Sequence, residues 1–412
     1  MKNKIELSSP AGSWETLSAA IKAGADSIYF GVSHLNMRSH SSVNFTLDDL
    51  NKIVRKCKKH RAKTYLTLNT VLYNEDLNLA KTICDAAKKA GISAVICFDM
   101  AVIRFAHSIG LQVHISTQAN ISNIESVKYF SSFADAIILA RELSLEQISS
   151  ICSSIKNENI LGPSGKPVKI EVFVHGALCV SIAGKCYMSL ATQNASANRG
   201  KCFQPCRRAY KVIDKETEQE LVVDNQYVMS PKDLCTIGII DKLINSGISI
   251  FKIEGRARSP EYVYTATECY KEAIQSSING TFSKRKIDLW KNKLHSVYNR
   301  GFWENGYYLG KKLGEWTSHP GSLSTCRKTF SGIAVKYFPR AKIAEILLQS
   351  GGLKINDNIL ATGPTTGLVK AKIKSICVND TPVKKASKGD RITIPIPDKI
   401  RRNDKIYVLT AR

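Results

Sequence analysis

Residues Lys169–Tyr210 read KIEVFVHGALCVSIAGKCYMSLATQNASANRGKCFQPCRRAY. The stretch opens with an apolar, β-branched run that ends in His-Gly, and this pattern predicts a buried strand. The remainder is rich in Gly, Ala, Ser and Asn and holds four of the chain's twelve cysteines. We therefore expect a long cysteine-rich insertion directly after a buried strand.

Seven other segments resemble this strand. Each is apolar enough to be covered on both faces, as parallel strands are. They are residues 4–8, 27–32, 63–69, 94–99, 112–118, 136–140 and 249–255.

Amphipathic helical segments follow the strands. In TLDDLNKIVRKCKKH, for example, Leu50, Ile53 and Val54 fall on one helical face. The other predicted helices cover residues 14–23, 77–90, 101–107, 124–133, 145–155, 234–245 and 262–275. Eight β–α units in roughly 275 residues favour an α/β fold of the TIM-like (β/α)8 barrel type. A doubly wound open sheet is the alternative, but it usually has fewer strands.

The sequence predicts three regions. Residues 1–282 form the barrel, with the cysteine-rich insertion at 177–232 after strand 7. Residues 283–330 are basic and aromatic and predict a helix with a linker. Residues 331–412 alternate short strands with turns, which predicts a small β-barrel domain.

In such a barrel the chemistry takes place where the strands end, at the C-terminal mouth. Polar residues gather at these predicted ends, and the insertion would lie over the same mouth. They are Tyr29, Gly31, Asn69, Asp99, Gln118, Asn120, Arg141, Glu142, His175, Glu254 and Arg256. Asp99 and Glu142 could instead only cap the helices that follow them.

The net charge is +24 over 412 residues, with 43% hydrophobic and 23% charged residues. So positive a protein favours a nucleic-acid partner, through contacts to phosphates. A generally lysine-rich proteome would give the same charge. No signal-peptide core and no apolar run of transmembrane length is visible, so we expect a cytoplasmic protein without a membrane partner.

Clustered thiols in a cytoplasmic chain indicate metal or redox chemistry more often than disulfides. The gap between Cys179 and Cys186 is too wide for a zinc knuckle, which only Cys202 and Cys206 fit. An irregular four-cysteine loop favours an iron–sulfur cluster, with zinc as the alternative. The neighbouring Lys and Arg side chains are expected to lower the thiol pKa values. Cys235, in a predicted helix, is the alternative to Cys206 as fourth ligand.

Several motifs resemble those of one known family. The segments VHGALCVSIAGKCYMS, ANRGKCFQPCR, HISTQAN and SIFKIEGRARSPEYV resemble the collagenase-like peptidase family, peptidase family U32. Its members include RNA hydroxylation proteins. The resemblance implies hydroxylation of the tRNA wobble uridine at C5, with prephenate as a small acidic co-substrate, and leaves room for a paralogous partner subunit.

The same resemblance implies a set of functional residues. A cluster of the 4Fe–4S type would be held by Cys179, Cys186, Cys202 and Cys206. Catalytic residues would be His175, Gln118, Arg141, Glu254 and Arg256. Arg199, between the cysteines, could join Arg141 and Arg256 in binding a carboxylate or phosphate.

Three further functions remain open at the level of sequence. The family name suggests a peptidase, for which His175 and Cys179 could form a Cys–His pair. Neither an H-E-x-x-H nor a G-x-S-x-G motif occurs. Hydroxylation of a ribosomal RNA cytidine is the second of these functions, and a non-catalytic RNA-binding factor with a structural zinc is the third.

Overall fold

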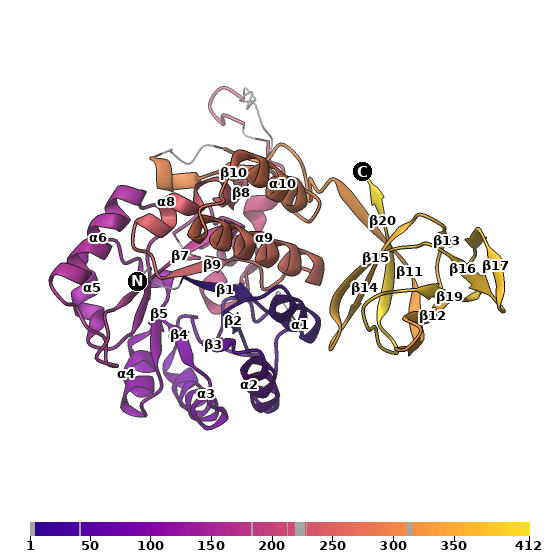
Figure 1. The fold of residues 1–412 in the computed structure, drawn as a ribbon. Helices are drawn as coiled ribbons and strands as arrows, with labels where there is room; N and C mark the ends of the chain where they lie inside the picture. The colour runs from indigo at the N-terminus through magenta and orange to yellow at the C-terminus, as the bar shows by residue number, and fades with distance from the viewer. Residues whose placement is uncertain are drawn as a thin grey trace.

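A computed structural model describes residues 5–40, 43–182, 184–211, 213–218, 227, 229–310 and 315–412. The residues outside these ranges include several within the predicted insertion. Two bodies are evident in Figure 1: an α/β barrel and, at its side, a sheet formed by the C-terminal part of the chain.

Eight parallel strands close into a barrel. Each pairs with its neighbour in the chain, and β9 pairs with both β1 and β7 to complete the ring. The strands are β1 (Glu6–Pro10), β2 (Ser27–Phe30), β3 (Lys63–Thr67), β4 (Ala94–Cys97), β5 (Val113–Ile115), β6 (Ala136–Ile138), β7 (Lys169–Gly176) and β9 (Ile250–Ile253). The predicted (β/α)8 barrel is therefore confirmed, with the cysteine-rich insertion after β7.

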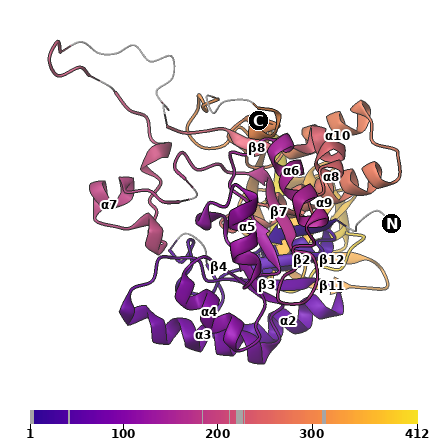
Figure 2. The same ribbon diagram turned by 90° about the vertical axis from the view of Figure 1, so that its left-hand side faces the viewer.

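Helices surround the strands. They are α1 (Trp14–Lys22), α2 (Leu50–Lys59), α3 (Leu77–Ala90), α4 (Met100–Ser108), α5 (Ile124–Ser131), α6 (Leu145–Asn157), α7 (Met188–Gln193), α8 (Ile240–Asn245), α9 (Pro260–Ile278) and α10 (Lys284–His295). Among the described residues, none of these helices combines the length and hydrophobicity needed to cross a bilayer. Helix α7 belongs to the insertion, and Figure 2 shows it apart from the outer ring of helices.

The predicted helix at 234–245 is wrong in its first half. Residues Asp233–Cys235 form strand β8, which pairs antiparallel with the end of β7 and parallel with β10 (Phe302–Glu304). Cys235 is therefore a buried strand residue, not a helical one. Strand pairing fixed this segment, although its local apolar pattern also suits a helix.

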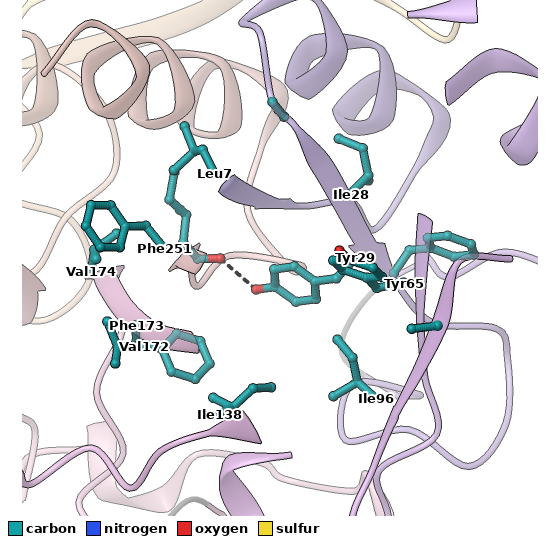
Figure 3. Packing of buried hydrophobic residues seen from close by; sticks show 14 of the residues in the cluster. Leu7, Ile28, Tyr29, Tyr65, Ile96, Ile138, Val172, Phe173, Val174 and Phe251 are labelled. Atoms are coloured by element: carbon teal, nitrogen blue, oxygen red, sulfur yellow. Dashed lines mark hydrogen bonds between the residues drawn. The ribbon is translucent and has the colours of Figure 1, made fainter. Parts of the chain in front are cut away.

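The barrel interior is packed with apolar side chains. Figure 3 shows Tyr29, Ile96, Ile138 and Phe173 pointing from four different strands toward a common space, and Tyr29 Oη donates to Ile253 O over 2.7 Å. These four side chains also line the cavity described below. The apolar core thus forms the floor of the candidate site.

The C-terminal region is an antiparallel sheet in the order β15-β14-β20-β11-β12-β19-β16-β17. Over 326–411, which the structure describes throughout, these pairings run as an open ladder with β15 and β17 at its ends. Its strands are β11 (Cys326–Phe338), β12 (Ile343–Leu348), β14 (Asn358–Gly363), β15 (Gly367–Lys372), β16 (Ile376–Val378), β17 (Thr381–Val383), β19 (Arg391–Pro395) and β20 (Lys405–Ala411), beside the small pair β13 (Leu353–Lys354) and β18 (Lys385–Ala386).

This sheet is attached to the barrel through helix α1. Ala19 packs with Leu360 and Leu368, and Lys22 Nζ donates to Leu368 O over 3.0 Å. Gly367 permits the approach: its φ is +68°, and a Cβ there would lie 2.7 Å from the Ala19 backbone nitrogen. The attachment is on the side of the barrel, so the mouth remains with the insertion.

Candidate active site at the mouth of the barrel

A cavity of about 320 Å³ lies where the barrel strands end, between the barrel and the insertion. The barrel contributes most of the predicted mouth residues, and the insertion contributes all four candidate thiols. The lining includes Tyr29, Asn69, Gln118, Arg141, Glu254, Arg256, Cys179, Cys186, Cys202 and Cys206. The two sets of residues predicted from the sequence therefore meet in one site.

Glu254 is held beside β7 by backbone contacts. Its N–H donates to His175 O over 2.8 Å. Gly176 makes this closeness possible, because its φ is +103° and a Cβ there would lie 2.5 Å from Glu254 O. The Glu254 carboxylate accepts from Arg38 Nη2 over 3.0 Å, and its other oxygen lies 3.2 Å from Tyr29 Oη.

Burial alone would raise the pKa of Glu254. Arg38, Arg141 and Arg256 outweigh that effect and lower the pKa to about 2. Glu254 is therefore an anion that organises the surrounding arginines. It is not available as an acid at neutral pH.

The lowered pKa of Glu254 leads to a testable prediction about the stability of the protein. Because the folded value lies below the ordinary 4.5, ionised Glu254 stabilises the folded protein above pH 4.5. This contribution, on the order of 3 kcal/mol, is lost as the pH falls from about 4.5 to about 2. Urea midpoints of wild type and Glu254→Gln should differ at pH 7 and converge over that window. A difference that stays constant down to pH 3 would contradict the assignment, and exposed Glu216→Gln serves as the control.

Gln118 and Arg256 are fixed by hydrogen bonds to neutral groups. Gln118 Nε2 donates to Asn69 O over 2.6 Å, and Gln118 Oε1 accepts from Asn69 Nδ2 over 2.8 Å. Arg256 Nη1 donates to Asn36 Oδ1 and Thr67 Oγ1 over 2.9 and 2.7 Å. Burial lowers the pKa of Arg256 to about 10, which still leaves it charged at neutral pH.

Cations dominate the cavity wall. Among the described residues that line it, seven are Lys or Arg and Glu254 is the single carboxylate. Lys252 is paired with Glu171, and Arg258 and Arg300 lie 3.8 and 3.5 Å from Asp233.

Three of the lining guanidinium groups have only neutral hydrogen-bond partners among the described residues. Arg141 Nη1 donates to Ala177 O over 3.0 Å, and Arg207 Nη1 donates to Pro231 O and Ser230 Oγ. Arg256 is the third. This arrangement suits an anionic ligand, since a carboxylate or phosphate can bind several guanidinium groups at once.

His175 does not reach the cavity. It is 1% exposed, its ring stacks 5.8 Å from that of Tyr262, and Nδ1 lies 3.4 Å from Tyr270 Oη. Burial, with Arg258 nearby, lowers its pKa to about 3, so the imidazole is neutral. The register of β7 shifts between Phe173 and His175, so His175 does not share the cavity-facing orientation of Phe173. Its expected place among the catalytic residues is not supported by this geometry.

The four candidate thiols are held in the insertion by local contacts. Cys186 Sγ accepts from Met188 N over 3.4 Å, and Cys179 Sγ lies 3.0 Å from Ser181 Oγ. Burial raises the pKa of the Cys206 thiol, although Arg207 opposes the shift. The expected lowering of the thiol pKa is therefore wrong for Cys206, because desolvation outweighs the neighbouring cation.

The arrangement of these thiols can be compared with what each metal requires. A zinc ion holds all its ligands about 2.0–2.3 Å from one point. Within the described part of the chain, no three His, Cys, Asp or Glu side chains form so compact a group. In a four-iron cluster each thiolate binds a different iron, so the sulfurs lie farther apart. Four free thiols line one cavity, and a donor set of four cysteines can hold either a zinc ion or an iron–sulfur cluster.

Some site residues are not predicted from the sequence, and Arg199, like His175, is misplaced by it. Arg38, Arg258 and Arg300 line the cavity. Arg258 follows the KIEGR motif, which is a usable signal, whereas nothing local marks Arg38. Arg199 was expected to bind an anion, but it pairs with Asp76 and lies 4.0 Å from the Tyr73 ring. Asp99 caps α4 by accepting from Ala101 N over 2.9 Å, in the capping role that its position also allowed.

Residues 12–318, which include the barrel after its first strand, the insertion and helix α10, match peptidase family U32. This chain belongs to peptidase family U32. The match includes every candidate site residue, and the family resemblance predicted from the motifs is confirmed.

Relatives in the family carry two kinds of name. A "Collagenase" of Porphyromonas gingivalis is 52% identical over 410 residues, covering 100% of this chain and 99% of the relative. A 23S rRNA 5-hydroxycytidine synthase of Escherichia coli is 34% identical and covers 67% of this chain and 40% of the relative. The tRNA hydroxylation protein P1 of Bacillus subtilis is 32% identical and covers 66% and 64%. These names, peptidase and RNA hydroxylase, support an enzyme.

Proposed function

We propose that this protein is an RNA-modifying redox enzyme that hydroxylates a pyrimidine at C5. The substrate that fits the resemblance best is the wobble uridine of tRNA, with a ribosomal RNA cytidine as the alternative. Prephenate is the proposed small acidic co-substrate. The observation that carries the proposal is that four thiols and a cation-rich wall share one cavity.

A cluster would be held by Cys179, Cys186, Cys202 and Cys206. When bound, it would supply electron-transfer chemistry that side chains lack, which matters because C5 hydroxylation adds an oxygen atom and removes two electrons from the ring. The chain's own residues bind and orient the reactants. Gln118 and Asn69, hydrogen-bonded to each other, contribute polar groups to the cavity wall, while Tyr29, Ile96 and Phe173 form its apolar floor.

Arg141 is the side chain best placed to bind the acidic co-substrate. Its guanidinium lies 4.0 Å from the Phe173 ring, and its Nε is buried without an acceptor in the described structure. Arg141→Ala should weaken prephenate binding roughly 10- to 150-fold, the range for losing a hydrogen bond to a charged group. Arg141→Lys should restore it only in part, because an ammonium cannot form the planar, two-pronged contact.

Isothermal titration with prephenate measures this change. The surface substitution Arg55→Ala on α2 is the matched control. An unchanged affinity in Arg141→Ala would rule out this role for the residue.

The peptidase names of some relatives favour a second candidate function. The geometry opposes a Cys–His mechanism, because the neutral, buried His175 does not share the cavity with Cys179. Gelatin cleavage by the Cys179→Ser/Cys186→Ser double variant at the wild-type rate would show peptidase activity without these thiols. The peptidase is favoured by two results together: wild type cleaves gelatin and the double variant does not, and wild type does not modify RNA.

Mass spectrometry of RNA nucleosides tests the proposed function. Deleting the gene should remove a 5-hydroxypyrimidine nucleoside from tRNA or ribosomal RNA, and the wild-type gene should restore it. Any paralogue in the host must be deleted as well. Unchanged RNA in that strain would reject the proposal.

A further inference from the structure

The outer side of the insertion carries exposed aromatic rings next to the candidate cluster ligands. Tyr187 is 73% exposed and Phe203 is 55% exposed. Each directly follows a cysteine that lines the cavity. Such exposure is costly for large apolar rings, and it marks an interaction surface when several lie together.

The two rings lie on wall segments of the cavity. Cys186 and Met188 line the cavity, but Tyr187 between them does not. Likewise, Cys202 and Gln204 line the cavity, but Phe203 between them does not. The segments are joined, because Phe203 N donates to Ser189 Oγ over 3.1 Å. One face of these segments thus closes the cavity, and the other presents Tyr187 and Phe203 to solvent.

The part of the insertion that carries the two rings, residues 177–211, is basic, whereas residues 212–232 hold five Asp or Glu. From residue 177 to residue 211 the sequence contains six Lys or Arg and no Asp or Glu. Lys185, Lys201 and Arg208 are exposed. In Figure 2 the α7 part of the insertion stands at the edge of the molecule, where a large partner can reach it. Aromatic rings among cations are typical of surfaces that bind single-stranded nucleic acid by stacking and phosphate contacts.

We propose that Tyr187 and Phe203 form a stacking surface for unpaired bases of an RNA loop at the entrance of the cavity. Lys185, Lys201 and Arg208 contact the phosphates that flank these bases. This inference rests on the proposed function for its choice of RNA, and it specifies the form of the substrate. The enzyme takes an unpaired nucleotide from a loop, and a continuous duplex is not a substrate.

Binding to a fluorescently labelled RNA hairpin with a uridine-rich loop, and to the same stem as a blunt duplex, tests the proposal. Wild type should bind the hairpin more tightly. Tyr187→Ala and Phe203→Ala should each weaken hairpin binding roughly 5- to 150-fold, the effect of losing one base–aromatic stack. Tyr187→Phe should retain the affinity, because it keeps the ring. Tyr129→Ala, which removes a 59% exposed tyrosine from α5, is the matched control.

Salt dependence separates stacking from charge. The two alanine variants should keep the wild-type slope of log affinity against log salt concentration. Lys185→Ala and Lys201→Ala should each reduce that slope by about 0.7, the value per phosphate contact of a single strand. Melting temperatures show whether a variant is folded. If Phe203→Ala does not fold, Phe203→Leu carries the test, because it keeps an apolar side chain but removes the ring.

Equal binding of hairpin and duplex, or wild-type binding by both alanine variants, would overturn the proposal. Binding of gelatin in place of RNA, lost in Tyr187→Ala, would also overturn it and identify a peptide surface. Since the assay needs no turnover, ring-dependent RNA binding without hydroxylation would reject the proposed chemistry alone. Hydroxylation with ring-independent binding would reject the stacking surface alone.

Discussion

Replacing Cys202 with serine is expected to remove the cluster and with it the hydroxylation of RNA. Cys202 lines the cavity with the three other thiols of the insertion. A four-iron cluster needs a thiolate on each iron. Mutating a residue that hydrogen-bonds to a metal ligand typically lowers metal affinity or activity by about 10- to 100-fold. Mutating a ligand itself should therefore lower activity by more than about 100-fold. Iron content per chain and the yield of 5-hydroxypyrimidine nucleoside measure the effect.

Two cysteines elsewhere in the chain provide controls. Cys377→Ser changes a half-buried thiol in the C-terminal sheet, and Cys235→Ser changes a buried thiol in β8 that lies outside the cavity lining. Both variants should retain iron. Loss of iron in Cys235→Ser with retention in Cys206→Ser would assign the fourth ligand to Cys235 instead.

The second large effect is expected from the buried ion pair beneath the cavity. Lys252 Nζ lies 2.7 Å from Glu171 Oε1, and the two side chains are 4% and 0% exposed. Burial raises the pKa of Glu171, but Lys252 and His114 outweigh burial and lower it, so the carboxylate is charged. Glu171→Gln leaves Lys252 buried without its counter-charge, which should lower the free energy of unfolding by about 3–5 kcal/mol.

The Glu171→Gln substitution should also affect the candidate site. Lys252 lines the cavity, and its ammonium lies 4.3 Å from the centre of the Tyr29 ring. Urea unfolding of wild type, Glu171→Gln and the double variant Glu171→Leu/Lys252→Met separates the contributions. The double variant should recover most of the stability, because neither charge remains buried. A Glu171→Gln variant as stable as wild type would contradict this prediction.

The barrel could be predicted from the sequence because the patterns that mark its strands and helices lie within short segments of the chain. Each strand is a short apolar run and each helix has an apolar face, so the eightfold alternation is visible along the chain. Pairing across the sheet is not local. The apolar pattern around residues 233–235 suits a helix, and only pairing with the distant strands β7 and β10 makes them a strand.

The site divides in the same way. The thiols, Gln118, Arg141, Glu254 and Arg256 could be predicted because parallel strands end at one mouth. Arg38 could not, because its partner Glu254 lies 216 residues away. The sequence misplaces His175 because a register shift in β7, which the period of the strand does not reveal, changes where the chain directs it.

The central claim is that the insertion holds an iron–sulfur cluster over the cationic cavity. Analysis of metal and acid-labile sulfide in the anaerobically purified full-length protein tests it most directly. The account predicts a brown protein with about four iron and four sulfide per chain. A colourless protein with one zinc per chain and no iron would contradict it.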